Sequence, residues 1–89
     1  MANLYLIDKP AGKEALSLAQ RDKGAAVVLI QDGVYLDISA LGTAGVQVYA
    51  VKLDVERRGL ASRLPSHVKQ IDYGQLVDLI LANKVINFS

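Results

Sequence analysis

The sequence predicts an α/β domain built around a small, mainly parallel β-sheet. Four short apolar runs recur at residues 4–7, 26–30, 46–51 and 68–71, and the segments between them are long enough to hold crossover helices. The run at 26–30 is continuously apolar, as expected of a strand covered on both faces of a parallel sheet. Because 89 residues cannot sustain two cores, we expect residues 1–89 to form a single domain.

The first connecting segment is predicted to be a helix over residues 13–23. Its apolar side chains fall on one side at helical spacing, and polar residues fill the other side. The apolar positions are Ala15, Leu16 and Ala19. Pro10 and Gly12 mark the turn before this helix, and Gly24 follows as its C-terminal stop.

The last helix has the clearest signal in the chain. Asp72 and Gln75 have the spacing of a capping box, and Asn83 is expected to end the helix. Its apolar residues are predicted to form one face, made of Leu76, Val77, Ile80 and Leu81. The tail at 85–88 can add a short strand or pack on a neighbouring chain, and local sequence does not decide between the two.

The segment after the second apolar run admits two interpretations. The Asp-Gly pair at 32–33 is a hairpin signal, and apolar residues alternate from Val34 to Ile38. Equally, Val34, Ile38 and Leu41 have the i, i+4, i+7 spacing of a short helix that Gly42 would end. We favour the helix, because a buried parallel strand more often leads into a crossover than into a hairpin.

Composition limits the class of protein. The formal charge is +1, so there is no strong field to concentrate nucleic acid or anionic lipid around the molecule. No apolar run approaches the ~20 residues of a membrane span, and the N-terminal run is too short for a signal peptide, which favours a cytoplasmic protein. Hydrophobic residues make up 52% of this small chain, so self-association is expected.

The usual catalytic sets are missing from the sequence. There is no cysteine, which excludes disulfides, zinc-thiolate sites and a cysteine nucleophile in this chain. The Gly12-Lys13 pair is not a P-loop, because Glu14 stands where that motif needs Ser or Thr. Asp8 is a single acid rather than a Mg²⁺-binding cluster. His67, the only histidine, is expected to lie at the surface or to have a structural role. We therefore expect neither an independent enzyme nor a metal or cofactor.

Polar residues follow the second apolar run, at the edge where parallel sheets bind ligands. Gln31, Asp32 and Gly33 can bind a ligand or contact a partner chain there. The competing and favoured interpretation is structural, with Asp32 capping the next helix and Gly33 relieving a tight turn.

A second group of polar residues follows the third run and admits the same two interpretations. In structural terms, Asp54 is a plausible N-cap, Arg57 and Arg58 complement a helix C-terminus, and Gly59 is a plausible C′ residue. The basic residues nearby are Arg57, Arg58, Arg63, His67 and Lys69. On one face they could meet RNA phosphates, but without interleaved aromatic residues a solvated charged face is favoured.

Three segments together resemble the DsrE/DsrF/DsrH-like sulfur-relay proteins, and within them the DsrH/TusB branch. They are VLIQDGV at 28–34, VYAVKLDVERRGL at 48–60 and IDYGQLVDL at 71–79. The resemblance implies a three-layer α/β/α sandwich with a mainly parallel four- or five-stranded sheet. It also implies a cytoplasmic complex with DsrE- and DsrF-like (TusD and TusC) subunits, which passes persulfide sulfur between cysteines toward tRNA wobble-uridine 2-thiolation or dissimilatory sulfur metabolism.

The absence of cysteine qualifies what the resemblance implies. Some members of the DsrH branch have a cysteine in the first helix, where Ser17 is the nearest equivalent here. A serine hydroxyl cannot hold a transferable persulfide, so we expect a non-catalytic subunit. The alternative is a homo-oligomeric module that binds a small ligand or RNA.

The residues predicted to bind or to form an interface come from three segments of the chain. They are Gln31, Asp32, Gly33, Asp54, Arg57, Arg58 and Tyr73. Tyrosines 35, 49 and 73 are expected at the core edge or at an interface, and Val34, Tyr35 and the last helix are the suspected contact surface with other subunits. Contact with tRNA is expected to be indirect, and none is expected with a membrane.

Overall fold

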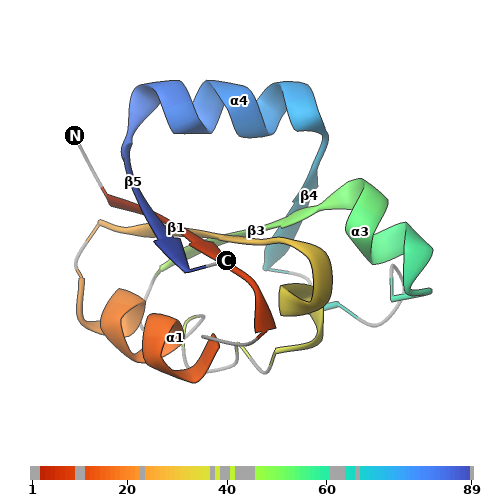
Figure 1. Ribbon diagram of the computed structural model, residues 1–89, viewed down its shortest axis with the longest axis horizontal. Helices are drawn as coiled ribbons and strands as arrows, with labels where there is room; N and C mark the ends of the chain where they lie inside the picture. The colour runs from red at the N-terminus through yellow and green to blue at the C-terminus, as the bar shows by residue number, and fades with distance from the viewer. Residues whose placement is uncertain are drawn as a thin grey trace.

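The computed structural model contains a five-stranded parallel β-sheet in the order β4-β3-β2-β1-β5 (Figure 1). The strands are β1 (Asn3–Ile7), β2 (Ala26–Leu29), β3 (Gln47–Val51), β4 (Val68–Ile71) and β5 (Lys84–Phe88). The structure describes residues 3–9, 12–22, 24–36, 38, 41, 46–60, 64–65 and 67–88. The four predicted runs form β1 to β4, and the tail adds the fifth strand, which pairs with β1.

Helices cover both faces of the sheet, as the predicted α/β/α sandwich requires. They are α1 (Gly12–Arg21), the 3-10 helix η2 (Gln31–Tyr35), α3 (Lys52–Arg57) and α4 (Tyr73–Ala82). Figure 1 shows α1 and α4 on opposite faces, with α4 running from β4 at one edge to β5 at the other. Among the described residues, no helix combines the length and apolarity needed to cross a lipid bilayer.

The core is divided by the sheet into two clusters. Side chains on alternate positions of β2 point to opposite faces: Val27 and Leu29 pack on the α1 side, whereas Val28 packs on the α4 side. All three are fully buried. This two-sided burial explains why the run at 26–30 is continuously apolar rather than alternating.

The predicted ends of α4 are confirmed. Asp72 and Gln75 form the reciprocal capping box at the start of α4, and Asn83 is its C-cap residue. Gly24 has the positive φ of 80° that suits a stop after α1. Both ends of α1 differ from the prediction, because Gly12 is its first residue rather than part of the preceding turn and the helix ends at Arg21 rather than at residue 23.

The prediction of a single apolar face on α4 is wrong. Leu76 and Ile80 pack against the sheet, whereas Val77 and Leu81 are 51% and 75% exposed. Consecutive helical residues are separated by about 100° around the axis, so the two pairs cannot share one narrow face. The helix therefore presents one apolar side to its own sheet and another to solvent.

The segment after β2 is helical and not a hairpin. A hairpin would join antiparallel strands, but β2 and β3 pair in parallel, and the 3-10 helix η2 begins their connection. The predicted continuation toward residue 41 falls largely outside the described residues, although Ile38 and Leu41 are both buried. Gly42, the predicted end of that helix, is also outside them.

Gly33 is buried where η2 crosses the end of β1. A Cβ atom at this position would collide with the backbone carbonyl of Ile7, whose oxygen already accepts a hydrogen bond from the Ile30 amide. Backbone atoms cannot rotate away as a flexible side chain can, so the absence of a side chain at Gly33 is required by this close approach.

We predict that Gly33→Ala lowers the free energy of unfolding by about 1–3 kcal/mol, because the added methyl group overpacks backbone atoms. Urea denaturation followed by circular dichroism measures this change. The control is Gly74→Ala on the exposed side of α4, where the added Cβ would meet only the exposed Asp72 side chain, at 3.3 Å from Oδ1, and alanine favours the helix, so stability should change by less than about 1 kcal/mol. Equal stability of the Gly33→Ala variant and the unmodified chain would contradict the predicted collision.

Candidate functional site

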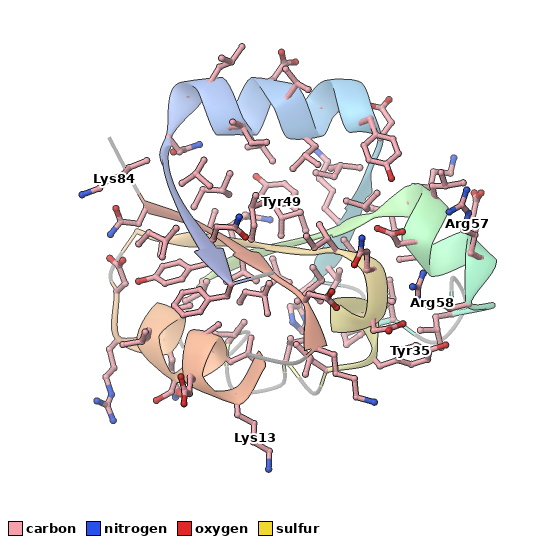
Figure 2. All side chains as sticks on the ribbon, viewed as in Figure 1. Lys13, Tyr35, Tyr49, Arg57, Arg58 and Lys84 are labelled. Atoms are coloured by element: carbon pink, nitrogen blue, oxygen red, sulfur yellow. The ribbon has the colours of Figure 1, made fainter. Side chains whose placement is uncertain are left out.

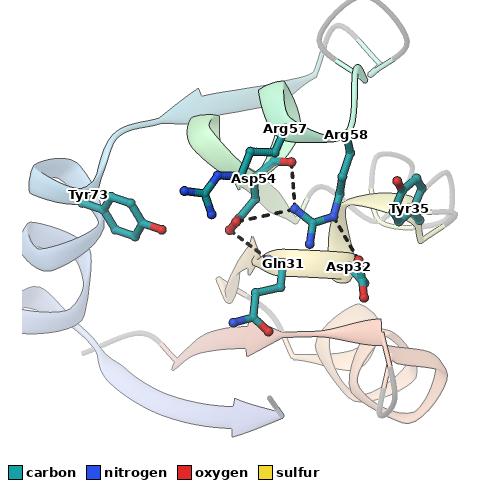
Figure 3. Close-up of a pocket in the computed structure, with 7 residues that line it drawn as sticks. All are labelled: Gln31, Asp32, Tyr35, Asp54, Arg57, Arg58 and Tyr73. Carbon is teal, nitrogen blue, oxygen red and sulfur yellow. Dashed lines mark hydrogen bonds and ion pairs between the residues drawn. The ribbon is translucent and has the colours of Figure 1, made fainter.

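An open cleft of about 520 Å³ lies at the carboxyl edge of the sheet, beyond β2 and β3. It is lined by Gln31, Asp32, Tyr35, Asp54, Arg57, Arg58 and Tyr73 (Figure 3). Segments that follow neighbouring parallel strands emerge at the same edge, which is why η2, α3 and the start of α4 meet there. The structure thus brings together six of the seven predicted candidates and adds Tyr35, while Gly33 lies buried beneath them.

Arg58 links the two walls of the cleft, which are formed by η2 and α3. Its Nε donates to Asp32 Oδ1 at 3.0 Å, and its Nη1 donates to the Asp54 carbonyl oxygen at 3.1 Å and lies 3.7 Å from Asp54 Oδ1. The hydrogen bond to Asp32, with the charges of both carboxylates, raises the pKa of Arg58 above its ordinary value despite an opposing effect of desolvation. Arg58 is therefore a permanent cation that holds η2 against α3.

Asp54 is buried, with 6% of its surface exposed, and it is not the predicted N-cap of α3. The N-cap is Val51, because β3 runs directly into the helix without a capping loop. Asp54 instead turns its carboxylate toward η2, where Oδ2 accepts the Gln31 amide hydrogen at 2.9 Å. Gln31 has a φ of 49°, a left-handed conformation that is costly for a residue other than glycine. Asp54 thus helps to hold the backbone of Gln31 in place at the cleft that this residue lines.

Asp32 does not cap a helix either. Ile30 occupies the N-cap position of η2 and makes no side-chain capping bond, while the exposed Asp32 carboxylate faces Arg58 across the cleft. The predicted role of Gly59 is confirmed, since it follows α3 with a φ of 65° as a C′ residue. Both aspartates therefore act between elements rather than at helix ends, a pairing that local sequence spacing does not reveal.

Arg57 lies in the last turn of α3, exposed at the cleft, and makes no ion pair within the described part of the chain. Tyr35 and Tyr73 contribute half-exposed aromatic rings to the same cleft, from η2 and from the start of α4. Figure 3 shows the Tyr73 ring directed from α4 toward the cleft. The cleft thus offers guanidinium and amide donors, carboxylate acceptors and aromatic surface, which suits binding of a polar or anionic group.

The predicted basic cluster is not gathered into one site. Arg58 is engaged by two carboxylates, whereas Lys69 lies beside Tyr49 in a separate groove between α4 and the sheet. Figure 2 shows Tyr49 beneath α4, well away from Arg57. His67 is exposed, and Arg63 lies outside the described residues. Val34, suspected as an interface residue, is instead buried in the core of the chain itself.

Comparison with known proteins assigns the chain to a family. A family model described as DsrH like protein matches residues 10–86. The chain belongs to the DsrH-like family. It is similar to the protein called TusB from Photorhabdus laumondii, with 40% identity over 63 residues, and to that from Salmonella arizonae, with 36%. Each match covers 64% of this chain and 66% of the relative's length.

A solved structure shows the same fold. The crystal structure of the ychN protein from E. coli superposes with a TM-score of 0.76, covering 99% of both chains at 18% sequence identity. The sequence-based resemblance to the DsrE/DsrF/DsrH-like proteins is thus confirmed for family and for fold.

Ser17 was expected, from the family resemblance alone, to stand nearest to the cysteine of some members, and this correspondence stays a prediction. Ser17 is exposed on α1 in a shallow hollow that it shares with Lys13, Glu14 and Leu18. The cleft is lined by residues of η2, α3 and α4, whereas Ser17 belongs to α1. Over the described residues, no group of three histidine, cysteine or acidic side chains is placed to hold a metal ion.

We predict that Asp54→Ala lowers the free energy of unfolding by about 1–3 kcal/mol, because it leaves the Gln31 amide without its acceptor and removes the carboxylate that pairs with Arg58. Asp54→Asn retains an oxygen for the Gln31 amide but removes the charge, so the decrease in the free energy of unfolding should be smaller. Urea denaturation compares both with Asp78→Ala, an exposed position where the change should stay under about 0.5 kcal/mol. A loss at Asp54 no larger than that at Asp78 would show that the contact is energetically unimportant.

Proposed function

We propose that this DsrH-like chain is a non-catalytic subunit of a sulfur-relay complex. Cysteine-bearing DsrE- and DsrF-like (TusD- and TusC-like) subunits would carry the persulfide, toward tRNA wobble-uridine thiolation or dissimilatory sulfur metabolism. The observation that carries the proposal is the combination of family membership over residues 10–86 with the absence of cysteine from all 89 residues.

The chemistry of persulfide transfer supports a non-catalytic role. A sulfane sulfur must be bonded to another sulfur, and it is released when an acceptor thiolate attacks it. Ser17 has a hydroxyl in place of that thiol, and the lining of the cleft includes no sulfur atom at all. What the chain can offer is a binding surface that orients a partner's cysteine or helps to dock the sulfur acceptor.

We predict that the purified chain takes up no sulfur from a cysteine desulfurase supplied with radiolabelled cysteine, because no thiol is present. Non-reducing electrophoresis measures the label on each chain. The matched control is Ser17→Cys, which supplies the missing thiol and should become labelled, so that a blank result for the unmodified chain is meaningful.

The same reconstitution tests the role as a subunit. Added to DsrE- and DsrF-like partners, the unmodified chain should associate with them and increase sulfur transfer to the final acceptor while staying unlabelled itself. Stable persulfide on the unmodified chain would contradict the proposal. Sulfur transfer by the partners that is the same with and without the chain would also contradict it.

Arg57 favours a second candidate function, the binding of RNA or a small anionic ligand in the cleft. Its guanidinium has no ion-pair partner among the described residues, and Arg57 lines the same cleft as two half-exposed tyrosines, Tyr35 and Tyr73. Stacking on tyrosine and charge pairing with arginine are the two contacts that single-stranded RNA uses. Arg58 is unsuitable as a test position, because its loss would break the link between η2 and α3.

We predict that, if the cleft binds RNA, Arg57→Glu weakens binding of a short uridine-containing RNA by about tenfold or more and lowers the salt slope by about 1. Fluorescence anisotropy at several salt concentrations measures both quantities. Arg21→Glu makes the same charge change on exposed α1 and should leave the affinity nearly unaltered if contact is confined to the cleft. Equal losses for the two variants would mean non-specific attraction and reject the site.

A further inference from the structure

We propose that the cleft binds an extended single strand of RNA at two points, and that Lys9 contacts a phosphate at the second point. This inference rests on the second candidate function and adds to it a residue that does not itself line the cleft. The first point is formed by Arg57 and Tyr73, and the second is formed by Lys9 and Tyr35.

The sheet order places the two points at opposite ends of one row. Strands β4, β3, β2 and β1 are neighbours in that order, and they are followed by the start of α4, by α3, by η2 and by residues 8–9. Because parallel strands all end at the same edge, these four segments lie side by side along it. Neighbouring strands are about 4.8 Å apart, so the row extends over about 14 Å from the end of β4 to the end of β1.

Lys9 reaches this row through Tyr35. Its Nζ lies over the Tyr35 ring, 5.8 Å from the centroid, which is within the range of a cation–π contact. The neighbouring Asp8 carboxylate is turned to the backbone instead, where Oδ1 accepts the amide hydrogen of Lys9 at 2.6 Å. In the part of the chain that the structure describes, the exposed Lys9 side chain makes no ion pair. Its charge is therefore available to a ligand beside an aromatic ring.

The first point has the same two components. Arg57 is exposed and has no ion pair among the described residues, and Tyr73 is 54% exposed. Figure 3 shows the Arg57 and Tyr73 side chains directed toward each other from α3 and α4. Each end of the row thus combines an uncompensated cation with an exposed aromatic ring.

The charges between the two points are already paired. Arg58 donates to Asp32 at 3.0 Å and lies beside the buried Asp54 carboxylate. Figure 3 shows Arg58 and Asp32 between Tyr73 at one end and Tyr35 at the other. A phosphate gains little from a compensated cation, so the favourable contacts for a polyanion lie at the two ends. The cleft therefore favours a ligand that is long enough to reach both.

The aromatic rings favour a single strand of RNA over other polyanions. Proteins bind single strands by stacking bases on aromatic side chains while cations follow the backbone. Tyr35 and Tyr73 come from different elements at opposite ends of the cleft, so the bases that stack on them must be splayed apart. A duplex keeps its bases paired and stacked, and an acidic peptide has no base to place on either ring.

Fluorescence anisotropy with single-stranded oligouridine of about eight nucleotides tests the second point. Lys9→Glu and Arg57→Glu should each weaken binding by about fivefold or more and lower the salt slope by about 1. The combined variant should show the product of the two losses, because the contacts are separate. Lys84→Glu is the control, since it makes the same charge change where Figure 2 shows a position remote from Arg57 and Tyr35, and it should leave the affinity nearly unaltered.

Two further comparisons separate stacking from charge. Tyr35→Ala should weaken binding by about fivefold or more, whereas Tyr35→Phe keeps the ring and should retain the affinity. An RNA duplex of the same length should bind less tightly than the single strand. Circular dichroism verifies that every variant remains folded.

The outcomes distinguish this inference from the function on which it rests. If Arg57→Glu weakens binding and Lys9→Glu does not, the second point is wrong and the second candidate function stands. If the unmodified chain does not bind oligouridine, or if neither variant alters binding, both are rejected. Equal affinity for the duplex would show attraction by charge alone and would overturn the two-point arrangement. None of these results bears on sulfur transfer, which is measured separately by labelling.

Discussion

The buried carboxylate of Asp54 is the constraint on which the carboxyl edge of this protein depends. It accepts the backbone hydrogen of Gln31 from η2 and lies beside Arg58, which reaches on to Asp32. One residue of α3 thereby helps to hold the neighbouring connection at Gln31, whose backbone is in a left-handed conformation. A buried acid is tolerated only when its charge is paired and it is hydrogen-bonded. The partners of Asp54 lie on both walls of the cleft, and these contacts hold the walls in place relative to each other.

The two arginines of the cleft differ in whether their positive charge is already paired within the protein. Arg58 is committed to two carboxylates, so its charge is largely compensated within the protein. Arg57, next to it in sequence, has no such commitment among the residues that the structure describes. Two adjacent arginines thus have different physical roles, one holding the edge together and one open to a ligand or an acidic partner. Because the chain has no thiol, the sulfur-relay role that we propose for it depends on surfaces of this kind.

Helix α4 shows a similar division between an inner row of residues that packs on the sheet and an outer row that does not. As the connection between the two edge strands, it must lie across the whole sheet, and its inner residues close that face. The outer row, formed by Tyr73, Val77 and Leu81, is exposed and does not cover the sheet. Both rows are apolar, so composition alone suggests one broad hydrophobic face. The distinction follows from the angle at which the helix meets the sheet, which no local pattern specifies.

The sequence by itself determined the positions of β1 to β4, the ends of α4 and the family, because burial periodicity, capping chemistry and motif spacing are local properties. It also placed Gln31, Asp32, Asp54 and the arginines near one sheet edge, since parallel strands bring their following segments together. Only the tertiary structure decided that both aspartates bind across elements instead of capping helices, and that Gly33 lies against β1. These contacts join residues far apart in the chain, and their geometry depends on strand order and packing rather than on sequence spacing.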